Sequence, residues 1–155
     1  MDAPRIEPLS IADAGELLTL QRAAYVSEAQ IYGDPSLPPL VQTLTEVVSE
    51  LSNCLAHKAV RGCRMVGAVR SVVDGDTLHI GRLTVAPDLQ GIGLGSALLA
   101  AAEADAGSGV TSAALFTGHR SVGNLRFYER HGYVEERREV VNAGLTLVHL
   151  RKPLH

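Results

Sequence analysis

Apolar residues recur in the first part of the chain with the spacing of a helix. Between Ala14 and Gln30 they return every three or four positions, which predicts a first helix that runs to about Gln30. Ser10 and Asp13 have the spacing of a capping box in front of it. The Gly-Asp-Pro sequence at 33–35 ends the pattern, because glycine and proline both interrupt helices.

A second helical pattern starts at Thr43 and carries Glu46 three residues on, which is again the spacing of a capping box. Its predicted buried face comprises Leu44, Val47, Val48 and Leu51. Two later helices are predicted over 93–106 and 121–132, and glycine ends both patterns.

The remaining apolar runs are rich in β-branched residues or alternate with polar ones, which predicts strands. The predicted strands are 5–9, 54–60, 64–73, 77–85, 110–116, 133–141 and 145–150. Most neighbours are separated by short turns, such as Asp74-Gly75, and are expected to form antiparallel hairpins. The strand at 110–116 follows 77–85 through a helix, so this one pair is expected to be parallel.

These elements predict one α/β domain (α+β type) over residues 1–155, with a mixed, mostly antiparallel sheet flanked by four helices. The length is usual for one domain, and 46% of the residues are hydrophobic, which is enough for a core. The formal net charge is -3 without any block of Lys or Arg, which argues against nucleic acid or an anionic membrane as partner.

Three further features bear on the compartment and on metals. No apolar stretch reaches the roughly eighteen residues of a membrane span, and the N-terminal sequence MDAPRIEPLS lacks the pattern of a signal peptide. We therefore expect a cytoplasmic protein in which Cys54 and Cys63 stay reduced. Two cysteines without a C-x-x-C spacing predict no metal site.

The stretch over 83–102, LTVAPDLQGIGLGSALLAAA, carries the clearest chemical signal. Pro87 ends a strand, glycines follow at alternate positions (Gly91, Gly93 and Gly95), and a helix rich in Ala and Leu starts at once. Glycines let a ligand approach the backbone amides closely. The first turn of a helix has unpaired N–H groups and a partial positive charge. The combination predicts an anion site, most often one for phosphate.

Two common phosphate motifs do not fit this stretch. A P-loop ends in Gly-Lys-Ser/Thr, whereas these glycines run into Ser96 without a lysine. A dinucleotide-binding fingerprint needs G-x-G-x-x-G and an acidic residue at the end of the next strand. From Gly91 the sixth position is Ser96, and the apolar run at 113–116 ends without Asp or Glu.

What remains is Gln90-x-x-Gly93-x-Gly95 after Val85-x-Pro87, which resembles the pyrophosphate loop of the GNAT superfamily of acyl-CoA-dependent N-acyltransferases. The stretch at 124–133, NLRFYERHGY, is similar to the second signature of that family. The predicted order of elements, β-α-α-β-β-β-α-β-α-β-β, is also that of the GNAT fold, whose parallel strand pair splays apart. The resemblance therefore covers nearly the whole chain.

The resemblance implies an N-acetyltransferase that moves an acetyl group from acetyl-CoA to a primary amine by direct attack in a ternary complex, without a metal. The acceptor is implied to be a small-molecule or peptide amine, and homodimers are common in the family. The backbone of Leu83 and Val85 is implied to hold the pantetheine arm, and the Val85 N–H to stabilise the oxyanion. The implied cosubstrate-binding residues are Leu83, Thr84, Val85, Gln90, Gly91, Ile92, Gly93, Leu94, Gly95, Ser96, Asn124, Phe127 and Tyr128.

The resemblance also implies two catalytic residues, Tyr128 and His79. Tyr128 is expected near the sulfur, where its hydroxyl protonates the leaving thiolate. Several family members use a glutamate on the strand before the loop as base, and His79 holds that place here. By strand alternation His79 shares one face with Leu83 and Val85, and an imidazole titrates near neutral pH. The alternatives are His119, in the loop before the last helix, a base that acts through a water molecule, or no base at all.

The acceptor pocket is implied to be walled by the end of the first helix, with Tyr25, Glu28 and Tyr32 as substrate-binding residues. Simpler interpretations stay open: Glu28 as a solvated helix charge, Tyr128 as a core aromatic, His79 as an ordinary strand residue, and the glycine loop as a plain turn. A second hypothesis is a non-catalytic acyl-CoA-binding sensor, and a third is a nucleotide-binding regulatory domain.

Overall fold

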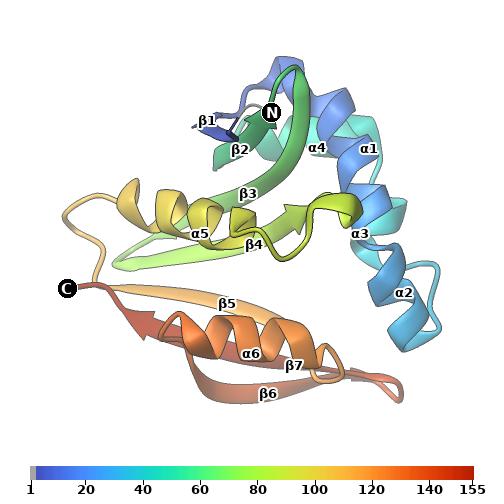
Figure 1. Ribbon diagram of the computed structural model, residues 1–155. Coiled ribbons are helices and arrows are strands. Elements are labelled where there is room, and N and C mark those ends of the chain that lie inside the picture. The colour runs from blue at the N-terminus through green and yellow to red at the C-terminus, as the bar shows by residue number, and fades with distance from the viewer. Residues whose placement is uncertain (1–2) are drawn as a thin grey trace.

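The computed structural model describes residues 3–155 and places them around one seven-stranded sheet (Figure 1). The strands are β1 (Arg5–Pro8), β2 (Leu55–Arg61), β3 (Arg64–Asp74), β4 (Thr77–Val85), β5 (Ser112–Gly118), β6 (Val134–Asn142) and β7 (Leu145–Pro153), in the spatial order β1-β2-β3-β4-β5-β7-β6. The helices are α1 (Ala14–Ala24), α2 (Val26–Tyr32), α3 (Pro38–Val41), α4 (Leu44–Leu51), α5 (Leu94–Ala104) and α6 (Val122–Arg130), with 3-10 turns at Ile11–Asp13 and Pro87–Leu89.

The predicted sheet is confirmed. Every neighbouring pair of strands is antiparallel except β4 and β5, which are parallel. The last strand, β7, continues beyond its predicted end at 150, because Pro153 still pairs with Ser112 of β5. The mixed, mostly antiparallel sheet of the GNAT fold is therefore present.

The helices differ from the prediction in the first third of the chain. Tyr25 interrupts the predicted first helix and separates α1 from α2. The prolines that were expected only to break a helix begin α3, since proline is well suited to the first turn. The capping box of Thr43 and Glu46 is present at α4. Leu44, at the first position of α4, is 50% exposed and does not join the buried face.

Helices cover both faces of the sheet, with α5 and α6 on one side and α1 and α4 on the other (Figure 1). The side chains of β3 show this division. A Cβ on Gly67 would lie 2.8 Å from Leu98 of α5. Arg70 instead donates hydrogen bonds to Gln21 of α1 at 2.5 Å and to Glu50 of α4 at 3.0 Å.

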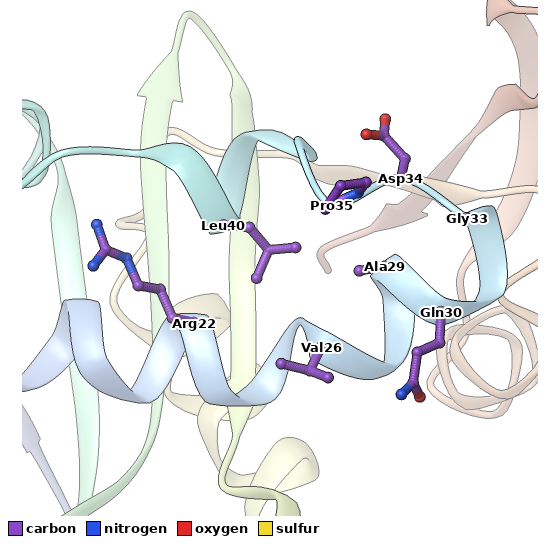
Figure 2. Close-up of a pocket in the computed structure, with 8 residues that line it drawn as sticks. All are labelled: Arg22, Val26, Ala29, Gln30, Gly33, Asp34, Pro35 and Leu40. Atoms are coloured by element: carbon purple, nitrogen blue, oxygen red, sulfur yellow. The ribbon is translucent and has the colours of Figure 1, made fainter.

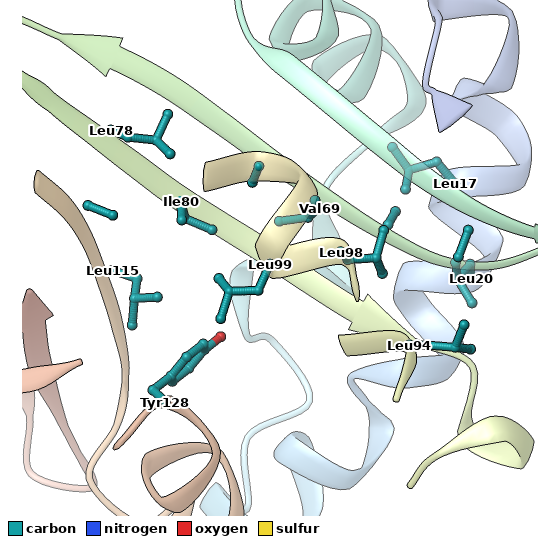
Figure 3. Packing of buried hydrophobic residues seen from close by; sticks show 14 of the residues in the cluster. Leu17, Leu20, Val69, Leu78, Ile80, Leu94, Leu98, Leu99, Leu115 and Tyr128 are labelled. Atoms are coloured by element: carbon teal, nitrogen blue, oxygen red, sulfur yellow. The ribbon is translucent and has the colours of Figure 1, made fainter. Parts of the chain in front are cut away.

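One core cluster joins the sheet to α5 on one face and to α1 and α4 on the other. Leu98 and Leu99 of α5 pack in one cluster with Val69 and Ile80 of the sheet, and Tyr128 of α6 closes the cluster on one side (Figure 3). Leu98 and Val69 are fully buried. Within residues 3–155, none of the helices combines the length and the apolar character that crossing a membrane would need.

The parallel pair β4 and β5 stays together only at its beginning. Three residues of β4 (77–79) pair with three residues of β5 (112–114). Beyond them the two strands diverge, while β4 stays on β3 and β5 stays on β7 (Figure 1). The divergence leaves the second half of β4 with one free edge.

A β-bulge at Arg82 changes the direction of the side chains along β4. Two residues of β4, Arg82 and Leu83, lie opposite one residue of β3, Val69. Arg82 has a φ of 52°, a left-handed conformation that is uncommon for residues other than glycine. The extra residue reverses the alternation, so Ile80 before the bulge and Leu83 after it both face α5.

The prediction that His79 shares a face with Leu83 and Val85 is therefore wrong. His79 precedes the bulge and lies on the opposite face, exposed beside its β3 partner Val72. Alternation assigns faces only while the pairing is regular, and no residue type in this strand marks the irregularity.

Candidate functional site

A cavity of about 1040 Å³ opens where β4 and β5 diverge. It is bounded by the second half of β4, the loop before α5, the end of β5 with α6, the segment 25–39 and the hairpin of β6 and β7. The predicted site residues that line it are Tyr25, Glu28, Tyr32, Leu83, Val85, Gln90, Gly91, Gly93, Leu94, Gly95, Ser96, Asn124, Phe127 and Tyr128. Among the other predicted residues, Thr84 and Ile92 adjoin this set along the chain without lining the cavity.

A second hollow of about 550 Å³ lies between α2 and α3 (Figure 2). Its lining residues are Arg22, Val26, Ala29, Gln30, Gly33, Asp34, Pro35 and Leu40. None of them is a predicted site residue, so the cavity between the diverging strands is the candidate site.

The loop before α5 presents six consecutive backbone N–H groups, from Gly91 to Ser96, that have no acceptor among residues 3–155. Gly91 has a φ of 79° and Gly93 one of 92°, both in the region that favours glycine. A Cβ on either residue would have nothing within 4 Å, so the amides are open to a ligand. Unpaired N–H groups at the positive end of a helix favour an anionic group.

Side-chain contacts hold both ends of this loop. Before it, Arg64 donates to the two carboxylate oxygens of Asp88 at 2.7 and 2.8 Å, and these hydrogen bonds lower the pKa of Asp88 to about 2. After it, Ser96 donates to Nε2 of His131 at 2.9 Å, because Nδ1 of that ring donates to the Phe127 carbonyl at 2.8 Å. The amides are thus fixed in position by the fold.

The free edge of β4 offers further backbone groups. The Ala86 N–H donates to the Val66 carbonyl of β3 at 2.9 Å. Because an antiparallel ladder bonds every second residue to the same neighbour, the N–H and C=O groups of Leu83 and Val85 point to the open side. The Gln90 side chain donates to one of them, the Val85 carbonyl, at 3.2 Å. An extended ligand can pair with such an edge as an additional strand does.

Tyr128 reaches the cavity from α6 and is only 9% exposed. Its ring packs edge-on against Phe127 and Tyr133. Within the described part of the chain its hydroxyl has no hydrogen-bond partner. Burial raises the pKa of this hydroxyl well above its usual value, and the neighbouring Tyr25 and Glu28 raise it further. The hydroxyl therefore keeps its proton at neutral pH.

Glu28 lies on the cavity wall at the centre of a hydrogen-bond network. It accepts from the Ser121 hydroxyl at 2.5 Å and from the Asn124 amide at 3.3 Å. Tyr32 donates to Ser121 at 2.8 Å and accepts from the Arg120 N–H at 3.0 Å. All partners of the Glu28 carboxylate among residues 3–155 are neutral, so its charge is available to a cation.

Neither histidine considered as a base lines the cavity. His79 lies on the other face of the sheet, as described above. The Nδ1 atom of His119 lies 3.0 Å from the Thr146 N–H and 3.2 Å from the Thr146 carbonyl, so this ring nitrogen is engaged with the backbone of β7. The structure thus brings Tyr128 and Glu28 together and leaves both imidazoles outside.

Sequence reasoning missed much of the cavity wall, including the side chains of Glu50 and Arg82 and the position of Gly118. The position of the Glu50 side chain is determined by its ion pair with Arg70, which lies twenty positions further along the chain. The direction of the Arg82 side chain is determined by the bulge, and no sequence pattern predicts this bulge. Gly118 could have been noticed, because a glycine at the end of a strand often has a structural reason. Here the reason is steric, since a Cβ at this position would overlap the Tyr32 hydroxyl.

Among residues 3–155, no group of three His, Cys, Asp or Glu side chains is placed to hold a metal ion.

Comparisons with known proteins indicate the family to which the chain belongs. Curated proteins give no match. Among solved structures, the chain is similar to the PaiA N-acetyltransferase from Thermoplasma acidophilum in complex with coenzyme A, with 18% identity and a TM-score of 0.78 over 98% of this chain and 99% of that one. It is also similar to the ribosomal-protein-S18-alanine N-acetyltransferase from Escherichia coli, with 18% identity and a TM-score of 0.78 over 98% and 94% of the two chains. The smu.2055 protein from Streptococcus mutans gives 16% identity and a TM-score of 0.82 over 97% and 99%.

At these identities the solved structures show a common fold. The family itself is shown by sequence, since the profile of the acetyltransferase (GNAT) domain matches residues 35–154. The glycine loop and the stretch containing Asn124 and Tyr128 both lie within the matched range. The chain belongs to the GNAT family of acetyltransferases.

Proposed function

We propose that this protein is a cytoplasmic N-acetyltransferase that transfers the acetyl group of acetyl-CoA to a primary amine by direct attack within a ternary complex. The observation that carries the proposal is the run of six unpaired N–H groups from Gly91 to Ser96, beside the free edge of β4 and with Tyr128 on the same cavity wall. The coenzyme A complex of the Thermoplasma acidophilum relative supports an acyl-CoA as donor. Two free cysteines, Cys54 and Cys63, support a reducing compartment.

The residues present fit coenzyme A. The amides of 91–96 suit its pyrophosphate, because glycine leaves them uncovered and the start of α5 is positive. Leu83 and Val85 suit the amides of an extended pantetheine arm, and Asn124 and Phe127 lie on the opposite wall. Acetyl-CoA, when bound, supplies the acyl group as a reactive thioester.

Three groups of the chain are placed to assist the transfer. Glu28 holds the ammonium group of the acceptor and takes up one of its protons, which frees the nitrogen lone pair for attack on the acetyl carbon. The Val85 N–H donates to the carbonyl oxygen while that oxygen gains negative charge. The Tyr128 hydroxyl donates to the departing sulfur. A thiol has a pKa of roughly 8.5, so a phenol of higher pKa assists its departure by hydrogen bonding.

The test is to incubate the purified protein with acetyl-CoA and a panel of primary amines, and to follow the released thiol with DTNB and the product by mass spectrometry. We expect thiol release that depends on one class of amine. Binding of acetyl-CoA by calorimetry without turnover on any amine would favour the sensor hypothesis. Stabilisation by ATP and not by CoA would favour the nucleotide-binding hypothesis.

A further inference from the structure

Arg82 lines the candidate cavity, and its charge has no counter-ion in the described part of the chain. Within residues 3–155, no carboxylate lies within ion-pair distance of its guanidinium and no acceptor takes a hydrogen bond from it. Its Nε is buried without any partner. Because removing such a group from water without a replacement is costly, an unpaired guanidinium on a cavity wall points to an anion that binds there.

The backbone at Arg82 is consistent with this role. Its left-handed φ of 52° is strained for a residue with a Cβ, and such strain is concentrated at ligand-binding positions. The Thr84 hydroxyl donates to the Arg82 carbonyl at 2.9 Å and helps to hold the bulge. The fold therefore maintains a conformation that directs this side chain to the cavity.

The neighbouring arginine provides a contrast. Arg70 is 3% exposed, and it donates to Glu50 at 3.0 Å and to Gln21 at 2.5 Å. Its charge is neutralised within the protein, as is that of Glu50. Within residues 3–155, Arg82 is a cation of this cavity wall without a counter-ion, and Glu28 and Asp34 are carboxylates of the wall without a cationic partner.

Arg82 and Glu28 line the same cavity, and Tyr25 lines it with them. Burial raises the pKa of the Tyr25 hydroxyl, the Arg82 charge opposes this rise, and the Glu28 charge adds to it. A ligand that pairs with both charged side chains within this cavity needs an ammonium group and an anionic group.

We infer that the acceptor is a free amino acid, whose ammonium group binds Glu28 and whose carboxylate binds the guanidinium of Arg82. A guanidinium matches a carboxylate with two parallel hydrogen bonds. The inference rests on the proposed acetyl transfer and narrows its acceptor. One ammonium proton passes to Glu28 and frees the lone pair with which the amino nitrogen bonds to the acetyl carbon. The carbon–sulfur bond breaks, and the second proton that the nitrogen loses balances the one gained by the departing thiolate, giving an N-acetyl amino acid and free CoA.

The test uses acceptors that differ at one group: amino acids, their carboxamides and the corresponding amines without the carboxylate. Each is assayed with acetyl-CoA for the unchanged protein, Arg82→Gln and Arg82→Lys. The control is Arg137→Gln, which removes the same charge from an exposed position on β6. The ratio of kcat/KM for an amino acid to that for its carboxamide is compared between variants. The two amines differ in basicity, but this difference is the same in every variant and cancels.

We expect the unchanged protein to have a kcat/KM at least tenfold higher for its best amino acid than for the matching carboxamide. Arg82→Gln should remove this preference through KM, Arg82→Lys should retain part of it, and Arg137→Gln should match the unchanged protein. The KM for acetyl-CoA should stay the same in all variants. Thermal unfolding of each variant confirms that it is folded.

Two results would overturn the inference while leaving acetyl transfer intact: the same substrate preference in Arg82→Gln, or a higher KM for acetyl-CoA in that variant, which would assign Arg82 to the cosubstrate. Absence of turnover on every amine would contradict the proposed function instead. In that case the binding of amino acids to the CoA-bound protein is measured by calorimetry. Binding that is lost in Arg82→Gln would support the inference, and absence of binding to the unchanged protein would overturn it.

Discussion

Tyr128 and Tyr133 are neighbours in the core, with ring centroids 6.0 Å apart, but their hydroxyl groups are placed differently. Tyr133 donates to Glu103 at 2.7 Å, and Lys152 donates to the same carboxylate at 3.0 Å. The Tyr128 hydroxyl borders the cavity and has no partner among residues 3–155. Burial raises the pKa of both tyrosines. A raised pKa alone therefore does not identify a proton donor, whereas access to the cavity does.

Tyr128→Phe removes the hydroxyl with little change in volume. We expect kcat to fall on the order of 10²-fold, the usual contribution of a positioned acid, with unchanged affinity for acetyl-CoA. Steady-state kinetics and calorimetry measure the two effects. Tyr133→Phe is the matched control, which should lose about 1 kcal/mol of stability with its hydrogen bond and keep its kcat. Equal turnover in Tyr128→Phe and the unchanged protein would show that Tyr128 is only a packing aromatic.

At the scale of elements, the site is made by two irregularities of regular structure. One is the loop before α5, where Gly91 and Gly93 adopt left-handed conformations and leave amides unpaired. The other is the bulge in β4, which follows the point where β4 and β5 separate. At each irregularity, backbone or side-chain groups make no hydrogen bond or ion pair within the described part of the protein. These groups are therefore available to ligands.

Gly93→Val tests the first irregularity. The side chain strains a backbone with a φ of 92° and occupies the open space over the amides, so the affinity for CoA should fall at least tenfold, about 1.4 kcal/mol. Gly75→Val is the matched control, because Gly75 has a φ of 62°, has nothing within 4 Å of an added Cβ, and lies in the turn between β3 and β4. It should lose comparable stability and keep its affinity. Calorimetry that finds the same affinity in Gly93→Val would remove the loop from the binding site.

The two irregularities differ in how far sequence predicts them. The loop was predictable, because glycine, proline and the start of an apolar helix are local signals. The bulge was not, since Arg82 and Leu83 are ordinary strand residues and their conformation depends on pairing with Val69. The same limit explains the break at Tyr25, where helical periodicity continues across two separate helices. Local chemistry thus predicted the strands and the loop, while the acceptor side depends on tertiary pairing.

At the scale of the whole molecule, the sheet consists of two parts joined along a short seam. The strands β4 and β5 share only the pairs between 77–79 and 112–114. Beyond this seam the two parts meet through side chains. Ser96 of α5 donates to His131 after α6, and Tyr32 of α2 donates to Ser121 before α6. The proposed cosubstrate would lie in the same opening, between the loop and free edge of one part and α6 of the other.

A ligand that contacts both parts should stabilise the whole fold. At a concentration about a hundred times its Kd, CoA should add about 2.7 kcal/mol, which for a chain of this size raises Tm by roughly 5–10 °C. Hydrogen exchange should slow at the amides of 91–96 and at those of Leu83 and Val85, because these groups gain acceptors. Differential scanning calorimetry and exchange mass spectrometry measure the two effects. Gly93→Val is the control: with tenfold weaker affinity it should gain only about 1.4 kcal/mol at the same concentration, with a correspondingly smaller rise in Tm and weaker exchange protection. If ATP raised Tm as much as CoA does, the opening would be a general anion site, and the role assigned to the free edge of β4 would be wrong.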